Sequence, residues 1–198
     1  IGDVPASVFR QGGRDLLQDL LDRCRDRQQG AGLAMLGGTY SFGAGGYANT
    51  PIAPLLPVQM SPAERVDVGQ EPPASQFIPG PIQMFPGPDG LNHYLMQIGP
   101  DSAQLWRNLP PLKSGANRLV PKGGSVSLLA MTAQRDPLLL GWDTGFNRVL
   151  AFGVSDTWRW WTHGFEPIHQ RFWEQMLLWL ARMESDSDHP VWVKVSPR

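Results

Sequence analysis

The sequence predicts an α/β domain with a largely parallel β-sheet, and three stretches of the chain support this fold class. Residues 1–36 are typical of a strand end, an amphipathic helix and a second strand, which is the unit from which parallel sheets are built. After an excursion dense in proline, strand patterns resume near residue 125. A second amphipathic helix over residues 167–183 ends the regular structure.

The first unit is predicted from the spacing of its apolar residues. Residues 1–5 are typical of a strand end and its exit turn, and residues 14–27 carry an apolar stripe at helical spacing. Gly30 and Gly32 end this helix and lead into a strand at residues 33–36. Cys24 is the single cysteine and lies on the stripe, so we expect it to pack in the core. The stripe consists of Leu16, Leu17, Leu20, Leu21 and Cys24.

The middle of the chain is predicted to be irregular. Prolines recur through residues 50–100 and exclude a long helix, because proline lacks an N–H donor and blocks the preceding turn. Short pieces remain, such as a strand at residues 66–68 and a helix at residues 93–98. A loop is expected over residues 106–112.

Regular structure returns in the last third of the chain. Strands are predicted at residues 125–131, 137–141 and 148–154, and the turn around Gly145 should join the last two as an antiparallel hairpin. The final helix, over residues 167–183, presents one apolar face to the sheet. That face consists of Ile168, Phe172, Met176, Leu180 and Met183.

Composition limits the partners. The chain has 198 residues, a formal net charge of −1 and 41% hydrophobic residues, which is enough for one domain with a sizeable core. This charge balance gives no electrostatic reason to bind nucleic acid or an anionic membrane. No apolar run approaches the roughly 20 residues of a membrane helix, so we expect no direct membrane insertion by this segment. The cellular compartment is not fixed by these numbers.

The chain is predicted to be a piece of a longer protein. Residues 1–183 should form one domain, and residues 184–198 a linker and the start of a following segment. The reason is that Val191, Val193 and Val195 alternate like the first strand of something that follows. Other domains of that longer protein are therefore expected partners, besides an unknown small ligand.

A resemblance to a known family rests on two stretches. Residues 37–47 read GGTYSFGAGGY and are followed by TPIAPLLPVQM, which resembles the class I glutamine amidotransferase-like domains of large bacterial proteins. Residues 148–160, RVLAFGVSDTWRW, and then HQRFWEQMLLWLAR are similar to the closing strand and helix of those domains. The resemblance covers residues 1–183 and implies a flavodoxin-like three-layer α/β/α sandwich. It implies a mostly parallel sheet with an antiparallel C-terminal hairpin, lacking the first βα units, in a protein with a von Willebrand A-type module and membrane helices.

The resemblance also implies a scaffold without its catalytic chemistry. Active class I amidotransferases attack an amide with a cysteine in a G-x-C-x-G elbow and use a late His-x-Glu. Thr39 or Ser41 stands in place of that cysteine, depending on the alignment. Ser155, Asp156 or Thr157 stands where those enzymes have histidine. Glutaminase activity is therefore not expected. The expected function is that of a non-catalytic module that binds a ligand or a protein.

A hydrolase is the alternative interpretation. A strand, a sharp turn and an exposed hydroxyl are how α/β enzymes present a nucleophile. Ser41 or Thr39 would attack, and Asp156 would orient His163 as the base, in the chain order Ser, Asp, His. A serine in a glycine-rich turn often matches so short a nucleophile motif by chance. The competing interpretation is a Ser41 hydroxyl that caps the backbone following it.

No cofactor or metal site is predicted. The glycines of residues 37–46 resemble a phosphate cradle, but no G-K-[ST] and no helix-opening G-x-G-x-x-G accompanies them. We expect them to serve positive-φ turns and close backbone approach. His93 and His189 lack metal-ligand spacing, and His169 is interpreted as a hydrogen-bonded structural residue of the final helix.

Strand polarity predicts where a ligand would bind. Ligands of open α/β sheets gather beyond the carboxyl ends of the strands. Residues 38–41 and 155–158 follow two such strands and should meet there, joined by Asp3 from the first strand exit. The predicted binding residues are Asp3, Gly38, Tyr40, Ser155, Trp158 and Arg159, and the candidate catalytic residues are Thr39, Ser41 and Asp156.

Overall fold

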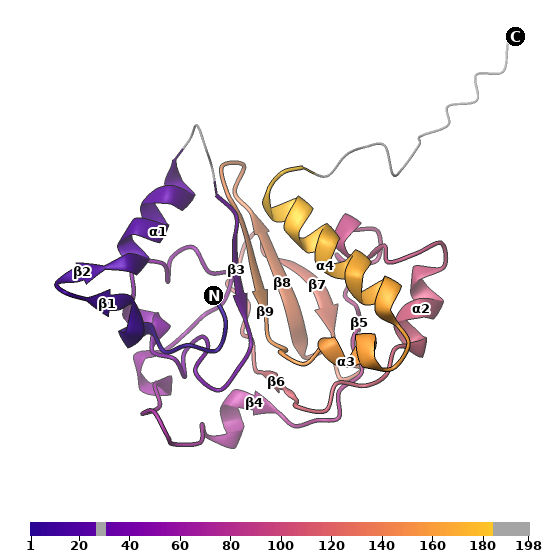
Figure 1. The fold of residues 1–198 in the computed structure, drawn as a ribbon, viewed down its shortest axis with the longest axis horizontal. Coiled ribbons are helices and arrows are strands. Elements are labelled where there is room, and N and C mark those ends of the chain that lie inside the picture. Colours follow the sequence, from indigo (N-terminus) through magenta and orange to yellow (C-terminus); the bar gives the residue numbers. More distant parts are fainter. Residues whose placement is uncertain (27–30, 184–198) are drawn as a thin grey trace, which may run out of the picture.

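The computed structural model describes residues 1–26 and 31–183 (Figure 1). Its centre is a five-stranded sheet in the order β3-β9-β8-β7-β5. The strands are β1 (Arg10–Gln11), β2 (Arg14–Asp15), β3 (Leu33–Leu36), β4 (Phe77–Ile78), β5 (Phe85–Pro86), β6 (Ala116–Asn117), β7 (Ser127–Met131), β8 (Pro137–Asp143) and β9 (Arg148–Phe152). The α-helices are α1 (Leu16–Arg25), α2 (Ser102–Asn108), α3 (Trp158–Thr162) and α4 (Glu166–Leu180). Single 3₁₀ turns are η1 (Ala6–Phe9), η2 (Tyr47–Asn49), η3 (Pro62–Glu64), η4 (Ala74–Gln76) and η5 (Tyr94–Met96).

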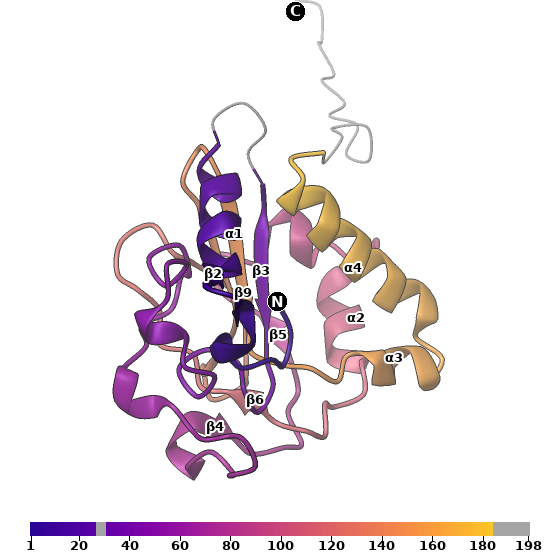
Figure 2. The same cartoon turned by 60° about the vertical axis from the view of Figure 1, so that its left-hand side comes forward.

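The two faces of the sheet are buried in two separate cores. Helix α1 and irregular chain cover one face, while α4 and α2 cover the other, as the two ribbon views show (Figures 1 and 2). Side chains alternate between the faces because the strand period is two residues. In β3, Leu33 and Met35 pack toward α1, and in β9, Leu150 and Phe152 pack toward α4. Within the described residues, no helix is long and apolar enough to cross a membrane.

The expected flavodoxin-like sandwich with a mostly parallel sheet is wrong. Among the named strands of residues 1–26 and 31–183, only β3 and β9 pair in parallel, and β9–β8, β8–β7 and β7–β5 are antiparallel. The connections explain the difference. Only residues 132–136 join β7 to β8 and only residues 144–147 join β8 to β9. Chain this short can close a hairpin, whereas a parallel pair needs a crossover of about a dozen residues or more.

The main elements were predicted within a few residues, and the errors lie in short pieces. Cys24 is fully buried in the core under α1, as expected. The loop expected over residues 106–112 instead begins inside α2, whose start is capped by Asp101 accepting a hydrogen bond from the Gln104 N–H at 3.3 Å. Helix α3 was missed because no side chain caps it. No strand forms at residues 66–68, and residues 184–198 lie outside the described part of the chain.

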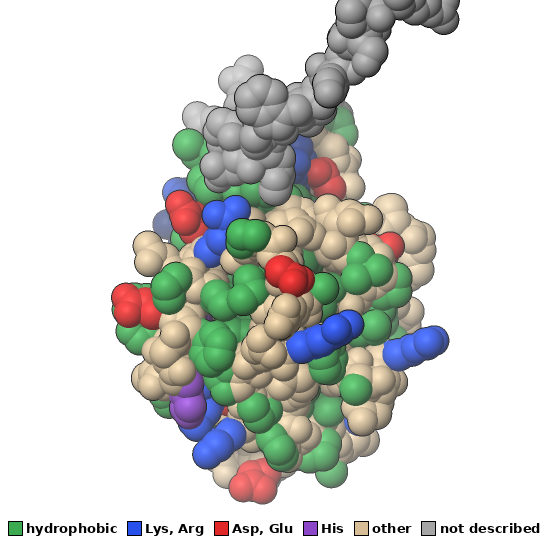
Figure 3. Space-filling model, turned by 90° about the vertical axis from the view of Figure 1, so that its right-hand side faces the viewer, with side chains coloured by type: hydrophobic (Ala, Val, Ile, Leu, Met, Phe, Trp, Pro, Cys, Tyr) green, Lys and Arg blue, Asp and Glu red, His purple; other side chains and the backbone are tan. Residues whose placement is uncertain are grey.

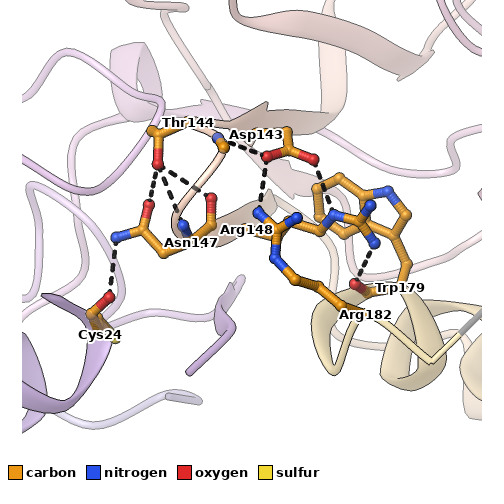
Figure 4. A network of polar contacts seen from close by, with 8 residues as sticks. Cys24, Asp143, Thr144, Asn147, Arg148, Trp179 and Arg182 are labelled. Atoms are coloured by element: carbon orange, nitrogen blue, oxygen red, sulfur yellow. Dashed lines mark hydrogen bonds and ion pairs between the residues drawn. The ribbon is translucent and has the colours of Figure 1, made fainter. Parts of the chain in front are cut away.

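The turn between β8 and β9 joins the sheet to both covering helices (Figure 4). Asn147 donates a hydrogen bond to the Cys24 carbonyl of α1 at 3.3 Å. Arg148 donates to the Trp179 carbonyl of α4 at 2.8 Å, and its guanidinium also lies 4.9 Å from the centre of the Trp179 ring. Burial alone would raise the pKa of Asp143, but hydrogen bonds from Arg148, the Gly145 N–H and Arg182 outweigh burial and hold that pKa below its usual value. This end of the sheet is therefore fixed by side chains.

His169, a residue of α4, lies in an aromatic cluster with tryptophans of α3 and of its own helix. Its ring centre is 6.5 Å from that of Trp160, 5.9 Å from Trp161 and 6.3 Å from Trp173. The buried Nε2 atom has no hydrogen-bond partner within the described residues. Burial removes water from the charged imidazolium, which lowers the pKa of His169 from its ordinary value of 6.5. His169 was expected to be hydrogen-bonded, but its Nε2 atom has no such partner and the ring packs against aromatic side chains instead.

We predict that His169 makes the folded protein less stable in mild acid. A histidine whose pKa is lowered in the folded state binds its proton more readily when unfolded, so the free energy of unfolding falls as the pH drops below the ordinary value of 6.5. Urea unfolding at about pH 7.5 and about pH 5.5 measures this loss. The loss should be smaller in His169→Phe than in the unaltered chain, and His163→Phe, at an exposed histidine, should behave like the unaltered chain. An equal loss in both variants would contradict the prediction.

Candidate functional site

Three backbone segments run parallel and end at one edge of the sheet. The amino group of Ile1 donates to the Ala34 carbonyl at 2.8 Å, and the Leu36 N–H donates to the Ile1 carbonyl at 2.8 Å. This pair of hydrogen bonds sets Ile1 beside β3 in the parallel sense, and β3 pairs in parallel with β9. The residues that follow each segment therefore meet at the same edge.

A cavity of about 130 Å³ lies at this edge. Four predicted residues line it, namely Asp3, Gly38, Thr39 and Ser155. The remaining wall comes from a segment that sequence reasoning did not include, residues 114–117, with Phe77 and Gly153. The polar side chains of the lining are those of Asp3, Thr39, Ser114, Asn117 and Ser155.

Asn117 in β6 forms the inner wall of this cavity and joins both strand exits. Its Oδ1 accepts a hydrogen bond from the Gly38 N–H at 2.8 Å, and its Nδ2 donates to the Gly38 carbonyl at 3.0 Å. Its own N–H donates to the Gly153 carbonyl at 2.8 Å. The residue is only 4% exposed. The one available sequence signal was the amide side chain itself, which needs hydrogen-bond partners if it is buried.

Glycines let these backbones approach closely. A Cβ atom on Gly37 would lie 2.2 Å from the Gly153 carbonyl oxygen, and one on Gly38 would lie 2.4 Å from Cγ of Asp3. Neither glycine has a positive φ. Of the two roles expected for these glycines, positive-φ turns and close backbone approach, the second therefore explains Gly37 and Gly38. In the turn that follows, Phe42 and Gly46 adopt left-handed φ angles of 54° and 79°.

Asp3 and Tyr40 hold the turn in place. Asp3 accepts a hydrogen bond from the Tyr40 N–H. The Tyr40 hydroxyl accepts one from the Gly69 N–H at 2.6 Å. Tyr40 does not line the cavity, so its place is beside the predicted site rather than within it.

Ser41 is not presented as a nucleophile. Its side chain is fully buried, and its hydroxyl donates a long hydrogen bond, 3.5 Å, to the Gly2 carbonyl. The partner thus precedes the turn and is not the following backbone that was expected. Ser41 lines a different cavity, of about 90 Å³, together with Glu64 and Gln76. Thr39 lines the cavity at the sheet edge instead.

Asp156 binds backbone and not an imidazole. Its Oδ2 accepts hydrogen bonds from the N–H groups of Lys113 at 2.8 Å and Ser114 at 3.0 Å. The residue is 3% exposed, and its Oδ1 has no hydrogen-bond partner within the described residues. Asp156 therefore positions the segment that walls the cavity.

The remaining predicted residues lie on α3, outside the cavity lining. Trp158 is 54% exposed, and the Arg159 guanidinium lies 5.4 Å from the centre of its ring. His163 follows α3, is exposed, and donates from Nδ1 to the Arg159 carbonyl at 2.7 Å. The serine, aspartate and histidine of the hydrolase interpretation thus each bind backbone of a different segment.

Cys24 is buried and lies outside the lining of both cavities described above. Burial raises the pKa of the Cys24 thiol, which keeps it protonated and unreactive. In residues 1–26 and 31–183, no three side chains of His, Cys, Asp or Glu gather closely enough to hold a metal ion.

Comparison with known proteins finds likeness in structure alone. No protein-family model matches the sequence, and neither does any curated protein. Among solved structures, the chain is similar to the cytoplasmic protein STM1381 from Salmonella typhimurium LT2, with 26% identity and a TM-score of 0.66. It is also similar to the cytoplasmic protein STM3548 from Salmonella typhimurium, with 18% identity and a TM-score of 0.62. Each match covers 91% of this chain and 70% of the other, so the chain shares its fold with both.

Proposed function

We propose that this chain is a non-catalytic binding module whose ligand occupies the cavity at the carboxyl ends of β3 and β9. One observation carries the proposal. The hydroxyl, carboxylate and imidazole that a hydrolase would bring together are each engaged by separate backbone groups, from Gly2, Lys113–Ser114 and Arg159. The cavity beside them keeps a polar lining. Such a site can hold a ligand without a nucleophile to attack it.

The lining selects a small ligand that donates hydrogen bonds. Asp3 contributes the single charged group of the wall, and it is negative. Thr39, Ser114 and Ser155 contribute hydroxyls, which both donate and accept. A volume of about 130 Å³ admits only a few non-hydrogen atoms, since one water takes about 30 Å³ in the liquid. An amide, an amine or a small hydroxyl compound fits this set of groups.

The family resemblance enters the proposal through the position of the glycine-rich turn. GGTYSFG follows the parallel strand β3 at its carboxyl end, where an amidotransferase-like domain would carry its nucleophile. The alcohols in place of the thiol, and the buried state of Ser41, favour a module that has lost the reaction. As part of the same proposal, the other domains of a longer protein are its partners.

We favour a small ligand in the cavity over a protein partner that would bind the exposed aromatic side chains. Figure 3 views the molecule from the right-hand side of Figure 1, where α2 and α4 lie, and its hydrophobic side chains alternate with polar and charged ones. Trp158 and Trp161 are exposed, but single exposed aromatic side chains are ordinary on monomeric proteins. A continuous apolar patch would argue for a protein partner instead.

Titration of ¹⁵N-labelled protein with acetamide, ethanolamine and glycerol tests the binding proposal. At least one probe should shift the amide resonances of Gly38, Ser114 and Ser155 with saturation, at about millimolar affinity for so few atoms. Ser155→Trp should abolish the shifts, because the indole fills the cavity. Ser125→Trp, at an exposed serine outside the lining, is the matched control and should leave them intact. Failure of all three probes, or unchanged binding in Ser155→Trp, would refute the proposal.

A fluorophosphonate probe tests for the absence of hydrolase chemistry. We expect no labelling of the protein, because the probe cannot reach a fully buried Ser41 hydroxyl that lacks a base. The Ser41→Ala variant should give the same background signal by mass spectrometry. We also expect no ammonia release from glutamine. Labelling that disappears in Ser41→Ala would restore the hydrolase interpretation.

A further inference from the structure

A third cavity, of about 320 Å³, is lined in part by the end of the glycine-rich turn. Three stretches of chain form it, at residues 5–10, 45–50 and 62–68. None of its lining residues belongs to the cavity at the carboxyl ends of β3 and β9. It is therefore a separate candidate site, independent of the proposed function.

The charged side chains of this cavity have an excess of positive charge. Arg10, Arg65 and Asp67 line it. Arg10 forms an ion pair with Asp15, with 3.5 Å between its Nε atom and the Asp15 carboxylate. The guanidinium of Arg65 forms no ion pair or hydrogen bond within the described part of the chain. Ser7, Asn49 and Thr50 add polar groups to the wall.

The turn supplies a wall to this cavity but not a backbone cradle for phosphate. The Gly45 N–H already donates to the Ser41 carbonyl at 3.2 Å, and the Gly46 N–H donates to the Gly43 carbonyl at 2.9 Å. The Tyr47 N–H donates to the Phe42 carbonyl at 3.1 Å. A P-loop binds phosphate through free amides, so this turn cannot act as one. These three amides are therefore not available to an anion in the cavity.

Gly46 leaves room for the Arg65 side chain at the cavity. A Cβ atom on Gly46 would lie 3.3 Å from Cδ of Arg65, so the aliphatic part of Arg65 passes directly over this glycine. Gly46 also has a φ of 79°, which favours glycine on backbone grounds. Gly46 thus adopts the left-handed conformation and also provides the surface against which the Arg65 side chain packs.

We propose that this cavity binds a small molecule through a single oxyanion, a carboxylate or a phosphate, with Arg65 as the principal cation and Arg10 as the second. A guanidinium matches either oxyanion with two parallel hydrogen bonds. Asp15 offsets part of the Arg10 charge, and Asp67 adds a negative charge to the wall. The site therefore fits one anionic group and disfavours a polyanion such as a triphosphate.

Titration of ¹⁵N-labelled protein with acetate and with inorganic phosphate, at constant ionic strength set with chloride, tests this site. The amide resonances of Gly46, Asn49 and Val66 should shift with saturation for at least one anion, and the tighter anion assigns the chemical class. Arg65→Gln should weaken binding about tenfold or more, as expected for the loss of a charged hydrogen-bond donor.

Arg107→Gln is the matched control, because it removes the same charge from an exposed position on α2 and should leave the affinity unchanged. Asp67→Asn should bind at least as tightly as the unaltered chain. Shifts that never saturate, or equal weakening in Arg65→Gln and Arg107→Gln, would overturn the proposal. Because the reporting amides differ from those of the β3–β9 cavity, failure here is distinguishable from failure of the proposed function.

Discussion

The arrangement of the candidate site depends on the contact of Asn117 with Gly38. The oxygen and the nitrogen of one buried side-chain amide bind the N–H and the carbonyl of one residue, Gly38, across a sequence separation of 79 residues. The same residue bonds through its N–H to Gly153 after β9. Loss of this side chain would leave the half-buried N–H and carbonyl of Gly38 without a protein partner, and a polar group left unpaired away from water typically costs about 1–3 kcal/mol. Asn117 thus holds the long irregular excursion against the only parallel strand pair among the described strands.

The two ends of the sheet are secured in different ways. At the β8–β9 turn, Arg148 and Asn147 reach across to carbonyls of α4 and α1 (Figure 4). At the opposite end, polar side chains hold loops to each other. Asp3 binds the Tyr40 N–H, and Asp156 binds the N–H groups of residues 113 and 114. The groups that could have served catalysis therefore serve the loops that wall a cavity.

The sequence predicted which residues meet at the edge of the sheet better than it predicted the fold around them. The meeting of Asp3, Gly38 and Ser155 follows from three parallel segments alone, and those were legible as a strand end, a helix and a strand. The wider sheet depends on the connections between strands. The turn after β8 predicted the antiparallel β8–β9 pair correctly, whereas the short connection before β8 was not interpreted as a hairpin and the family resemblance favoured a parallel sheet.

Other parts of the site were beyond reach of sequence patterns. Asn117 and Ser114 lie in a segment with two residues of strand, and what places them is a contact with a distant glycine. The pairing of Arg65 with Gly46 depends likewise on packing between loops. The burial of Ser41 was likewise not predictable, because no spacing rule reveals whether a side chain is buried. Local patterns predict strands and helices, whereas loop contacts are set by tertiary structure.

Hydrogen exchange at the Gly38 amide is the most direct measurement of the central claim that Asn117 fixes the site. Asn117→Ala should accelerate exchange of the Gly38 N–H about tenfold or more relative to that of Gly37, whose N–H donates to the Phe152 carbonyl at 2.6 Å. Asn147→Ala, which removes a buried asparagine at the opposite end of the sheet, should leave this ratio unchanged. An unprotected Gly38 amide in the unaltered protein, or the same ratio in both variants, would contradict the account.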